Sequence, residues 1–394
     1  MPGWMSEELA ERRRRGLKRV RRRVESAPGV RLRVRGRELL SFASNDYLNL
    51  AADPRLAQAA ARTARRYGCG AAASPLVCGA LPPHRALERA LAGWEGTAAS
   101  LVFSSGFAAN LAVLTALAGP PDAIFSDEWN HASLIDGCRL SRARVHVYRH
   151  GDVHHLHDLL TREGAQARRR FLVTDTVFSM DGDLAPLTEL AELSHLHDAL
   201  LVVDEAHATG ILGEHGRGVT DVPAVEAALD PDRLVKVGTL SKALGAQGGF
   251  VCGSRLLIDY LVNHARPYIF STALAPPTAG AGRRAVAIVQ EEPERRRHVL
   301  ALAEELRGQL QASGFSVHGS RCQILPILVG EAQPAVEWSA RLEEHGLLVP
   351  AIRPPSVPPA TARLRISLTA GHTRADVERL VSALRETRPR RYAN

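Results

Sequence analysis

Short apolar segments alternate with longer, helix-like segments through the middle of this chain, and this alternation constrains the fold more than any other feature. The apolar segments include residues 101–103, 123–125, 171–173 and 200–203. Strands that are apolar along their whole length are typical of a parallel sheet with helices on both faces. The pattern therefore predicts an α/β fold, in which ligands bind beyond the carboxyl ends of the strands.

Polar residues follow these apolar segments at just the places where such a sheet would expose them. Ser105, His131, Ser179, Asp204 and Lys242 each come directly after a predicted strand or its following turn. Because the carboxyl ends of parallel strands meet at one edge, we expect these side chains to lie together.

Lysine usage singles out one of these positions. Of the 50 basic side chains only three are lysines, namely Lys18, Lys236 and Lys242. Arginine stays protonated, whereas a partly buried lysine can lose its proton and act as a base or Schiff-base nucleophile. Lys242 lies in a small-residue turn, residues 238–245, after a predicted strand. The alternative is a surface lysine in a Ser-Gly loop.

Together these residues match what pyridoxal phosphate (PLP) requires. The cofactor needs a lysine, a carboxylate that keeps its pyridine nitrogen protonated, a phosphate cradle at a helix start and a flat group against its ring. Lys242, Asp204, the turn at 105–107 and His131 would supply these in turn. The turn lacks the Gly-Lys-Ser/Thr of a Walker loop.

Several other classes of protein are disfavoured. No apolar run approaches the ~18 residues that span a bilayer, and the N-terminus lacks a signal-peptide apolar region. Five scattered cysteines fit a reducing compartment, so we expect a cytoplasmic protein with no disulfide framework. His154, His155 and His157 do not share one helical face, which argues against a zinc site.

The N-terminal region carries an unusual density of positive charge. Nine basic residues lie between Arg12 and Arg23, within an expected helix over residues 6–23. Such a run can bind nucleic acid, but no aromatic platform accompanies it, so we interpret it as a solvated amphipathic helix.

Changes in composition and in the pattern of apolar segments along the chain predict three segments. Residues 1–50 form an N-terminal helix and small-strand segment, residues 51–287 a large cofactor-binding α/β domain, and residues 288–394 a C-terminal α+β domain. A long Arg/Glu-rich helix is expected from beyond Pro276-Pro277 to residue 312.

Many motifs, in order, resemble one family over almost the whole chain, from about Leu17 to the last helix. The chain is similar to the α-oxoamine synthases, a branch of the fold-type-I PLP enzymes. The motifs are SNDYL at 44–48, SGFAAN at 105–110, HASL at 131–134, VFSMDGD at 177–183, DEAH at 204–207, TLSK at 239–242, ST at 271–272, IRPPSVP at 352–358 and ARLR at 362–365. The resemblance implies a large domain with a mostly parallel seven-stranded sheet and a smaller α+β C-terminal domain.

The resemblance also implies roles around the cofactor ring. Lys242 would hold the cofactor, His131 would stack on its ring, and Asp204 would pair with the pyridinium nitrogen. His207 and Ser179 would contact the ring face and its phenolic oxygen.

The phosphate would be held at three positions of one chain and two of another. Gly106, Phe107 and Thr239 match the family's phosphate ligands, while Ser271 and Thr272 would reach in from a second subunit of a homodimer.

Four further residues match substrate positions. Asn45 and Arg365 resemble the clamp for the amino-acid carboxylate, for which the fork of an arginine is well suited. Arg19 and Ser356 match positions near the acyl substrate. The loop Gly70-Ala-Ala-Ala-Ser-Pro-Leu76 departs from the Gly/Ser-rich loop of relatives, which leaves its contacts with the acyl group or the neighbouring subunit open.

The implied reaction is the decarboxylative condensation of L-alanine with a pimeloyl thioester in biotin biosynthesis, with coenzyme A or acyl carrier protein as the carrier. Pro354-Pro355 together with Arg19 favour this acyl chain. The alternative is a sister enzyme that uses glycine, of the glycine C-acetyltransferase or 5-aminolevulinate synthase type. We expect no metal, no nucleic-acid partner and no membrane.

Overall fold

A computed structural model describes residues 3–317 and 319–389 and divides the chain into two compact units. Unit 1 contains the residues up to Asn49, Ser179–Asp183 and the residues from Arg297 onwards. Unit 2 contains Leu50–Phe178 and Leu184–Arg296. Most of the first and last of the three segments expected from the sequence thus belongs to one unit, because β2 and β11 pair with each other, whereas residues 288–296 belong to unit 2.

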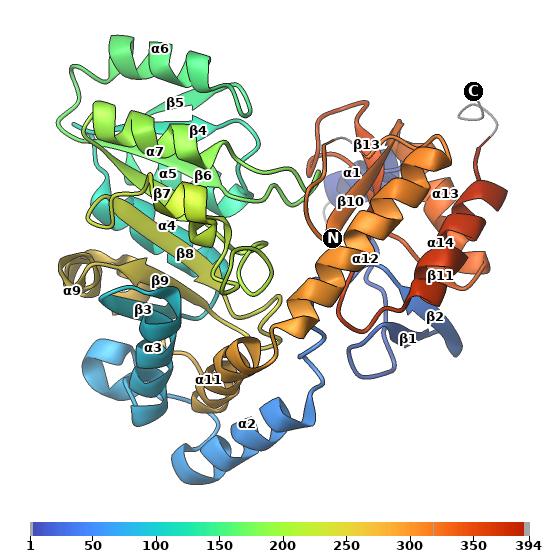
Figure 1. Cartoon of the computed structure of the whole chain (residues 1–394), viewed down its shortest axis with the longest axis horizontal. Coiled ribbons are helices and arrows are strands. Elements are labelled where there is room, and N and C mark those ends of the chain that lie inside the picture. The colour runs from blue at the N-terminus through green and yellow to red at the C-terminus, as the bar shows by residue number, and fades with distance from the viewer. Residues whose placement is uncertain (1–2, 318, 390–394) are drawn as a thin grey trace. The chain divides into compact units, whose positions relative to one another are not determined.

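Unit 2 is built on one seven-stranded sheet, drawn from teal to olive in Figure 1, with the strand order β3-β9-β8-β7-β6-β4-β5. The neighbouring pairs from β8 to β5 are all parallel, and β9 is antiparallel to both β8 and β3. The strands are β3 (Ala99–Phe103), β4 (Ala123–Asp127), β5 (Arg144–Tyr148), β6 (Arg170–Asp175), β7 (Ala199–Asp204), β8 (Leu234–Thr239) and β9 (Gly249–Gly253). The mostly parallel seven-stranded sheet that the resemblance implied is confirmed.

Helices cover this sheet because its central strands are apolar on both faces. Every residue of β4 and β9 is buried. The helical elements are α2 (Pro54–Tyr67), η1 (Pro75–Gly79), α3 (Pro82–Glu95), α4 (Gly106–Leu117), α5 (Ala132–Ser141), α6 (Val153–Glu163), α7 (Leu187–Leu196), η2 (Val219–Asp221), α8 (Pro223–Glu226), α9 (Arg255–His264), α10 (Arg266–Ile269) and α11 (Pro276–Glu291). Asp53 caps α2, since its carboxylate accepts a hydrogen bond from the Arg55 amide.

Unit 1 is the smaller α+β unit that the sequence predicted. Its two three-stranded sheets have the orders β1-β2-β11 and β10-β13-β12. They share an apolar core with three helices of the unit, α12, α13 and α14. Its elements are α1 (Gly3–Arg14), β1 (Arg31–Val34), β2 (Arg37–Ser41), most of α12 (Glu294–Ala312), β10 (Ile324–Gly330), α13 (Ala332–Glu344), β11 (Leu347–Leu348), β12 (Ala351–Ile352), β13 (Ala362–Ser367) and α14 (Arg374–Glu386).

Two expected helices are shorter than the sequence suggested. The N-terminal helix ends at Arg14 and not at residue 23, because Gly16 adopts a positive φ of 64° and bends the chain. The long helix expected before residue 312 is two helices, α11 and α12. Pro293 separates them, since a proline disfavours helical backbone at the residue before it.

Candidate active site

Four strands of unit 2 end side by side in polar residues. Asp127, Asp175, Asp204 and Thr239 are the last residues of β4, β6, β7 and β8, and all four are buried. Each Asp204 oxygen accepts one hydrogen bond, Oδ1 from the Ala206 amide at 2.8 Å and Oδ2 from Asn110 Nδ2 at 2.6 Å. A carboxylate oxygen can accept more than one hydrogen bond, so Asp204 can also accept one from a ligand.

The phosphate cradle lies at the start of α4. Ser105 Oγ accepts a hydrogen bond from the Ala108 amide and so caps the helix. The amides of Gly106 and Phe107 belong to the first turn, where they have no partner inside the helix. A side chain at Gly106 would lie 3.3 Å from Thr239 Cβ, so glycine keeps the space between this turn and β8 open. Free amides beside an open space are suited to a phosphate.

Lys242 lies in a bend just after β8, and the backbone around it is tightly fixed. Thr239 Oγ1 donates to the carbonyl of Gly248 at 2.9 Å and accepts a hydrogen bond from the Ser241 amide at 3.2 Å. Gly245 has a φ of 60°, and a Cβ there would lie 2.5 Å from the backbone of Leu50, so only glycine fits the close approach. The half-buried Lys242 is thereby held near the strand ends.

His131 caps α5 beside these residues. Its amide donates to Asp175 Oδ2 at 2.6 Å, and its ring meets the edge of the Phe107 ring at a centroid distance of 6.4 Å. The surrounding protein atoms lower the pKa of His131, Asp204 opposes this effect, and the positive charge of Lys242 adds to it. The ring is therefore favoured in its neutral form at pH 7.

Asp175 is an acid at this edge that the sequence reasoning did not single out. Burial raises its pKa well above the usual value, and the neighbouring Asp204 carboxylate raises it further. Its position as the last residue of β6 would have been the signal to find it.

The other lysines lie in different surroundings. Lys236 is buried within β8, and its ammonium contacts Glu95 Oε2 at 2.6 Å. Lys18 belongs to the N-terminal region of unit 1, where its carbonyl accepts a hydrogen bond from Arg353 at 3.1 Å. Lys242 is therefore the lysine that lies within electrostatic reach of His131 and Asp175.

Arg365 and Asn45, predicted to act together, are in contact within unit 1. Arg365 lies on β13 and is 5% exposed, and its Nη1 donates to Asn45 Oδ1 at 3.2 Å. The same guanidinium donates to Tyr47 Oη at 3.3 Å and to the carbonyl of Ser179 at 2.5 Å. Within residues 3–317 and 319–389, all its acceptors are neutral oxygens, the last being Ser367 Oγ at 3.0 Å.

Arg363, two residues earlier on the same strand, differs in one respect. It is 6% exposed, so neither arginine lies on the solvent side, but Arg363 forms an ion pair with Asp181. Its charge is thus already neutralised, whereas the charge of Arg365 is not.

Arg19 and Ser356 are brought to the same part of unit 1. Arg19 Nη2 donates to the carbonyl of Pro354 at 3.3 Å, two residues before the exposed Ser356. Arg353, which the sequence reasoning did not single out, donates to the carbonyl of Gly16. Burial lowers the pKa of Arg353, and the nearby charge of Arg19 lowers it further.

The remaining predicted residues vary in their placement. His207 is buried after β7. Ser271 and Thr272 are exposed after α10, beside Phe270, which is 70% exposed. Among the described residues there is no group of three or more His, Cys, Asp or Glu side chains that could hold a metal ion.

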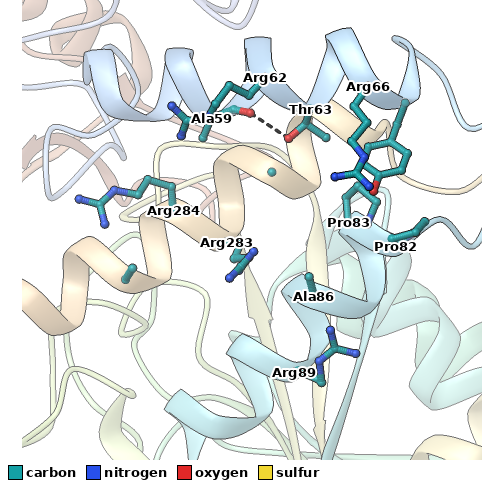
Figure 2. A pocket seen from close by; sticks show the side chains of 13 residues that line it. Ala59, Arg62, Thr63, Arg66, Pro82, Pro83, Ala86, Arg89, Arg283 and Arg284 are labelled. Carbon is teal, nitrogen blue, oxygen red and sulfur yellow. Dashed lines mark hydrogen bonds between the residues drawn. The ribbon is translucent and has the colours of Figure 1, made fainter.

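A cavity in unit 2 lies apart from these residues. It measures about 570 Å³ and is formed by α2, α3 and α11 (Figure 2). Its basic lining consists of Arg62, Arg66, Arg89, Arg283 and Arg284. None of the residues predicted to bind cofactor or substrate lines it.

Comparison with known proteins agrees with this chemistry. Residues 37–384 match the family model described as aminotransferase class I and II. The chain belongs to this family. It is 48% identical over 386 residues to the 8-amino-7-oxononanoate synthase of Anaeromyxobacter dehalogenans, which covers 98% of this chain and 96% of that protein. It is therefore a PLP-dependent acyltransferase, an α-oxoamine synthase of the biotin pathway.

Solved structures agree with the fold and the cofactor. A serine palmitoyltransferase from Sphingomonas wittichii matches 98% of this chain and 96% of its own, with 31% identity and a TM-score of 0.91. A second one, solved with a PLP internal aldimine, is 29% identical and also has a TM-score of 0.91. The residues at the sheet edge fit this cofactor. A buried carboxylate, a helix start kept open by glycine and a half-buried lysine lie within one unit.

No helix among the described residues is long and apolar enough to span a bilayer.

Proposed function

We propose that the chain joins L-alanine to a pimeloyl thioester, on coenzyme A or on acyl carrier protein. The products are 8-amino-7-oxononanoate, CO2 and the free thiol carrier. The observation that carries the proposal is the buried Arg365, whose positive charge has only neutral acceptors within the described residues. A buried charge without a counterion is costly, and a substrate carboxylate would neutralise it.

Three residues of unit 2 would hold, remove or donate a proton during the reaction. Bound PLP supplies an electron sink for the carbanion that forms at the α-carbon of alanine. The carboxylate of Asp204 holds a proton on the pyridine nitrogen, and Nζ of Lys242 removes the α-proton of the amino acid. Neutral His131 donates a hydrogen bond from its ring to the acyl carbonyl oxygen as negative charge develops there.

The phosphate end of the cofactor would be bound by the cradle. The amides of Gly106 and Phe107 at the start of α4 would hold it, and the hydroxyl of Thr239 would turn from the Gly248 carbonyl to the phosphate. His207 and Ser179 would contact the ring and its phenolic oxygen. A second copy of the chain would add Ser271 and Thr272. The exposed Phe270, Leu76 and Val77 support a homodimer, since large apolar side chains at a surface are typical of an interface.

Replacing Arg365 by alanine is expected to weaken alanine binding by roughly ten- to a hundredfold. A charge-assisted pair is worth about 1.5–3 kcal/mol, and 1.4 kcal/mol corresponds to a factor of ten. Titration of the cofactor's absorbance with L-alanine measures this affinity. PLP affinity should hardly change, because the proposed PLP ligands do not depend on Arg365.

Arg363→Ala is the matched control, since this arginine has the same burial but is paired with Asp181. It should destabilise unit 1 by removing the Arg363–Asp181 ion pair, while alanine affinity stays near that of the wild type. If Arg363→Ala loses alanine affinity and Arg365→Ala does not, then Arg363 and not Arg365 binds the alanine carboxylate, and the proposal is wrong.

Replacing Arg19 by alanine is expected to raise the apparent KM for the pimeloyl thioester several-fold or more. The far end of the pimeloyl chain is a carboxylate, which an exposed arginine beside a second cation, Arg353, is suited to bind. The spectral change induced by alanine should remain intact. An unchanged KM, or tight DNA binding by the wild type at physiological salt, would contradict this role.

A panel of acyl thioesters, each tested with alanine and with glycine, decides between the proposed reaction and the glycine-using alternative. The proposal predicts product only from alanine with the pimeloyl chain. Purified protein that prefers glycine with a shorter acyl chain would be a sister enzyme instead.

A further inference from the structure

A continuous chain of hydrogen bonds connects Asp204 to the ring of His131 inside unit 2. Asn110, on α4, donates from Nδ2 to Asp204 Oδ2 at 2.6 Å and to Ser133 Oγ at 2.9 Å. Ser133, on α5, contacts His131 Nδ1 through its hydroxyl at 2.7 Å. Asn110 and Ser133 are each 1% exposed. Water therefore does not compete for the contacts of Asn110 with Asp204 and Ser133.

The directions of the hydrogen bonds in this chain follow from its two ends. An ionised carboxylate can only accept, so the nitrogen of Asn110 and not its oxygen faces Asp204. That nitrogen carries two hydrogens, and the second points to Ser133 Oγ, which accepts it. At the other end the Ser133 amide donates to His131 Nδ1, so this nitrogen is an acceptor, and the Ser133 hydroxyl donates its proton to it.

This direction determines which nitrogen of His131 carries a proton. Nδ1 accepts from the hydroxyl of Ser133 and also from the Ser133 amide at 3.3 Å, so it has no proton of its own. A neutral imidazole has one N–H, which must then be on Nε2. The lowered pKa of His131 favours that neutral form.

Burying the Asn110 side chain costs stability, because one of its polar atoms is left without a partner among the described residues. Its Oδ1 is buried and has no hydrogen-bond partner among the described residues. Leucine would fill a similar volume without an unpaired polar atom. The two N–H donors of Asn110 are the property that leucine would lose.

We propose that Asn110 is a positioning residue that holds the Asp204 carboxylate and, through Ser133, keeps His131 as the Nε2–H tautomer. One residue thus orients both the group that holds the pyridine proton and the ring that donates to the acyl carbonyl. The inference rests on the proposed roles of Asp204 and His131. Its test depends on the protonation of a ring nitrogen rather than on product formation.

The first experiment measures the tautomer directly. Nitrogen NMR of the PLP-loaded protein with labelled histidine should show His131 with an unprotonated Nδ1 and a protonated Nε2, with the signals assigned from their loss in His131→Gln. Ser133→Ala should give a mixture of both tautomers, because only the weak amide contact to Nδ1 remains. Ser133→Thr, which keeps the hydroxyl, should restore the single tautomer.

Kinetics of the same variants distinguish positioning from packing. Ser133→Ala should lower kcat for condensation about tenfold or more, while the affinities for PLP and alanine stay unchanged. Asn110→Ala should do both, lowering kcat and weakening PLP binding by about tenfold, since Asp204 loses a charge-assisted hydrogen bond. Val113→Ala, an apolar change on the same helix, should leave the tautomer unaltered.

Two results would overturn the inference: a protonated Nδ1 in the wild-type protein, or an unchanged tautomer in Ser133→Ala. If Asn110→Ala does not fold, the Ser133 variants still decide, because they leave the Asn110–Asp204 contact in place. A wild-type protein that shows the expected tautomer but makes no product from alanine and a pimeloyl thioester would contradict the proposed function alone.

Discussion

Replacement of Lys242 by alanine is expected to leave a folded protein that still binds PLP but has no measurable turnover. The phosphate cradle at α4 and the Asp204 carboxylate do not depend on Lys242, so they should retain the cofactor. The variant loses the lysine whose charge acts on His131 and Asp175, and with it the base proposed to remove the α-proton of alanine.

The wild-type protein provides the accompanying measurement. It should be yellow, and borohydride reduction followed by peptide mapping should place the cofactor on the peptide that contains Lys242. Lys18→Ala is the matched control, because Lys18 lies in unit 1 and should be dispensable for cofactor binding. Recovery of the reduced cofactor on Lys18 or Lys236 would refute the assignment.

Replacement of Lys236 by alanine should have the largest effect on stability, about 3–5 kcal/mol of unfolding free energy. Lys236 and Glu95 form an ion pair at 2.6 Å, with side chains that are 7% and 1% exposed. Removing one partner leaves a buried charge without compensation, which is far more destabilising than losing both. Urea denaturation of the PLP-loaded protein, followed by circular dichroism, measures the change.

The double variant Lys236→Met/Glu95→Leu is the control for this interpretation. Well-packed apolar residues often replace a buried ion pair with little loss of stability, so the double variant should be closer to the wild type than Lys236→Ala. Equal destabilisation by the single and double variants would mean that packing, and not the unpaired carboxylate, causes the loss.

The mostly parallel sheet and the positions of its strands were predictable from the sequence because they depend on local patterns. A run such as residues 200–203 is apolar on every side, and the residue that follows, Asp204, must then lie at the carboxyl edge of the sheet. Helix boundaries were less predictable where one residue decides them. Gly16 ends the N-terminal helix early, and Pro293 divides the helix expected before residue 312.

The expected ligand set was likewise readable wherever a residue follows a strand or begins a helix. Asn110 and Ser133 were missed, although both lie within motifs that the sequence analysis quoted, because the hydrogen bond between them joins two helices, α4 and α5. Periodicity indicates which face of a helix is buried but not which polar atoms meet there.

The sequence by itself thus determined the fold class, the family, the cofactor and the candidate lysine. The tertiary structure decided which of several similar residues is neutralised. Arg363 and Arg365 occupy equivalent places on β13, yet Asp181, which is 182 residues away along the chain, pairs only with the first. Glu95, 141 residues from Lys236, likewise pairs with it and so distinguishes it from Lys242. The physical reason is that the burial and charge state of a side chain depend on its neighbours in space, which the chain brings together only on folding.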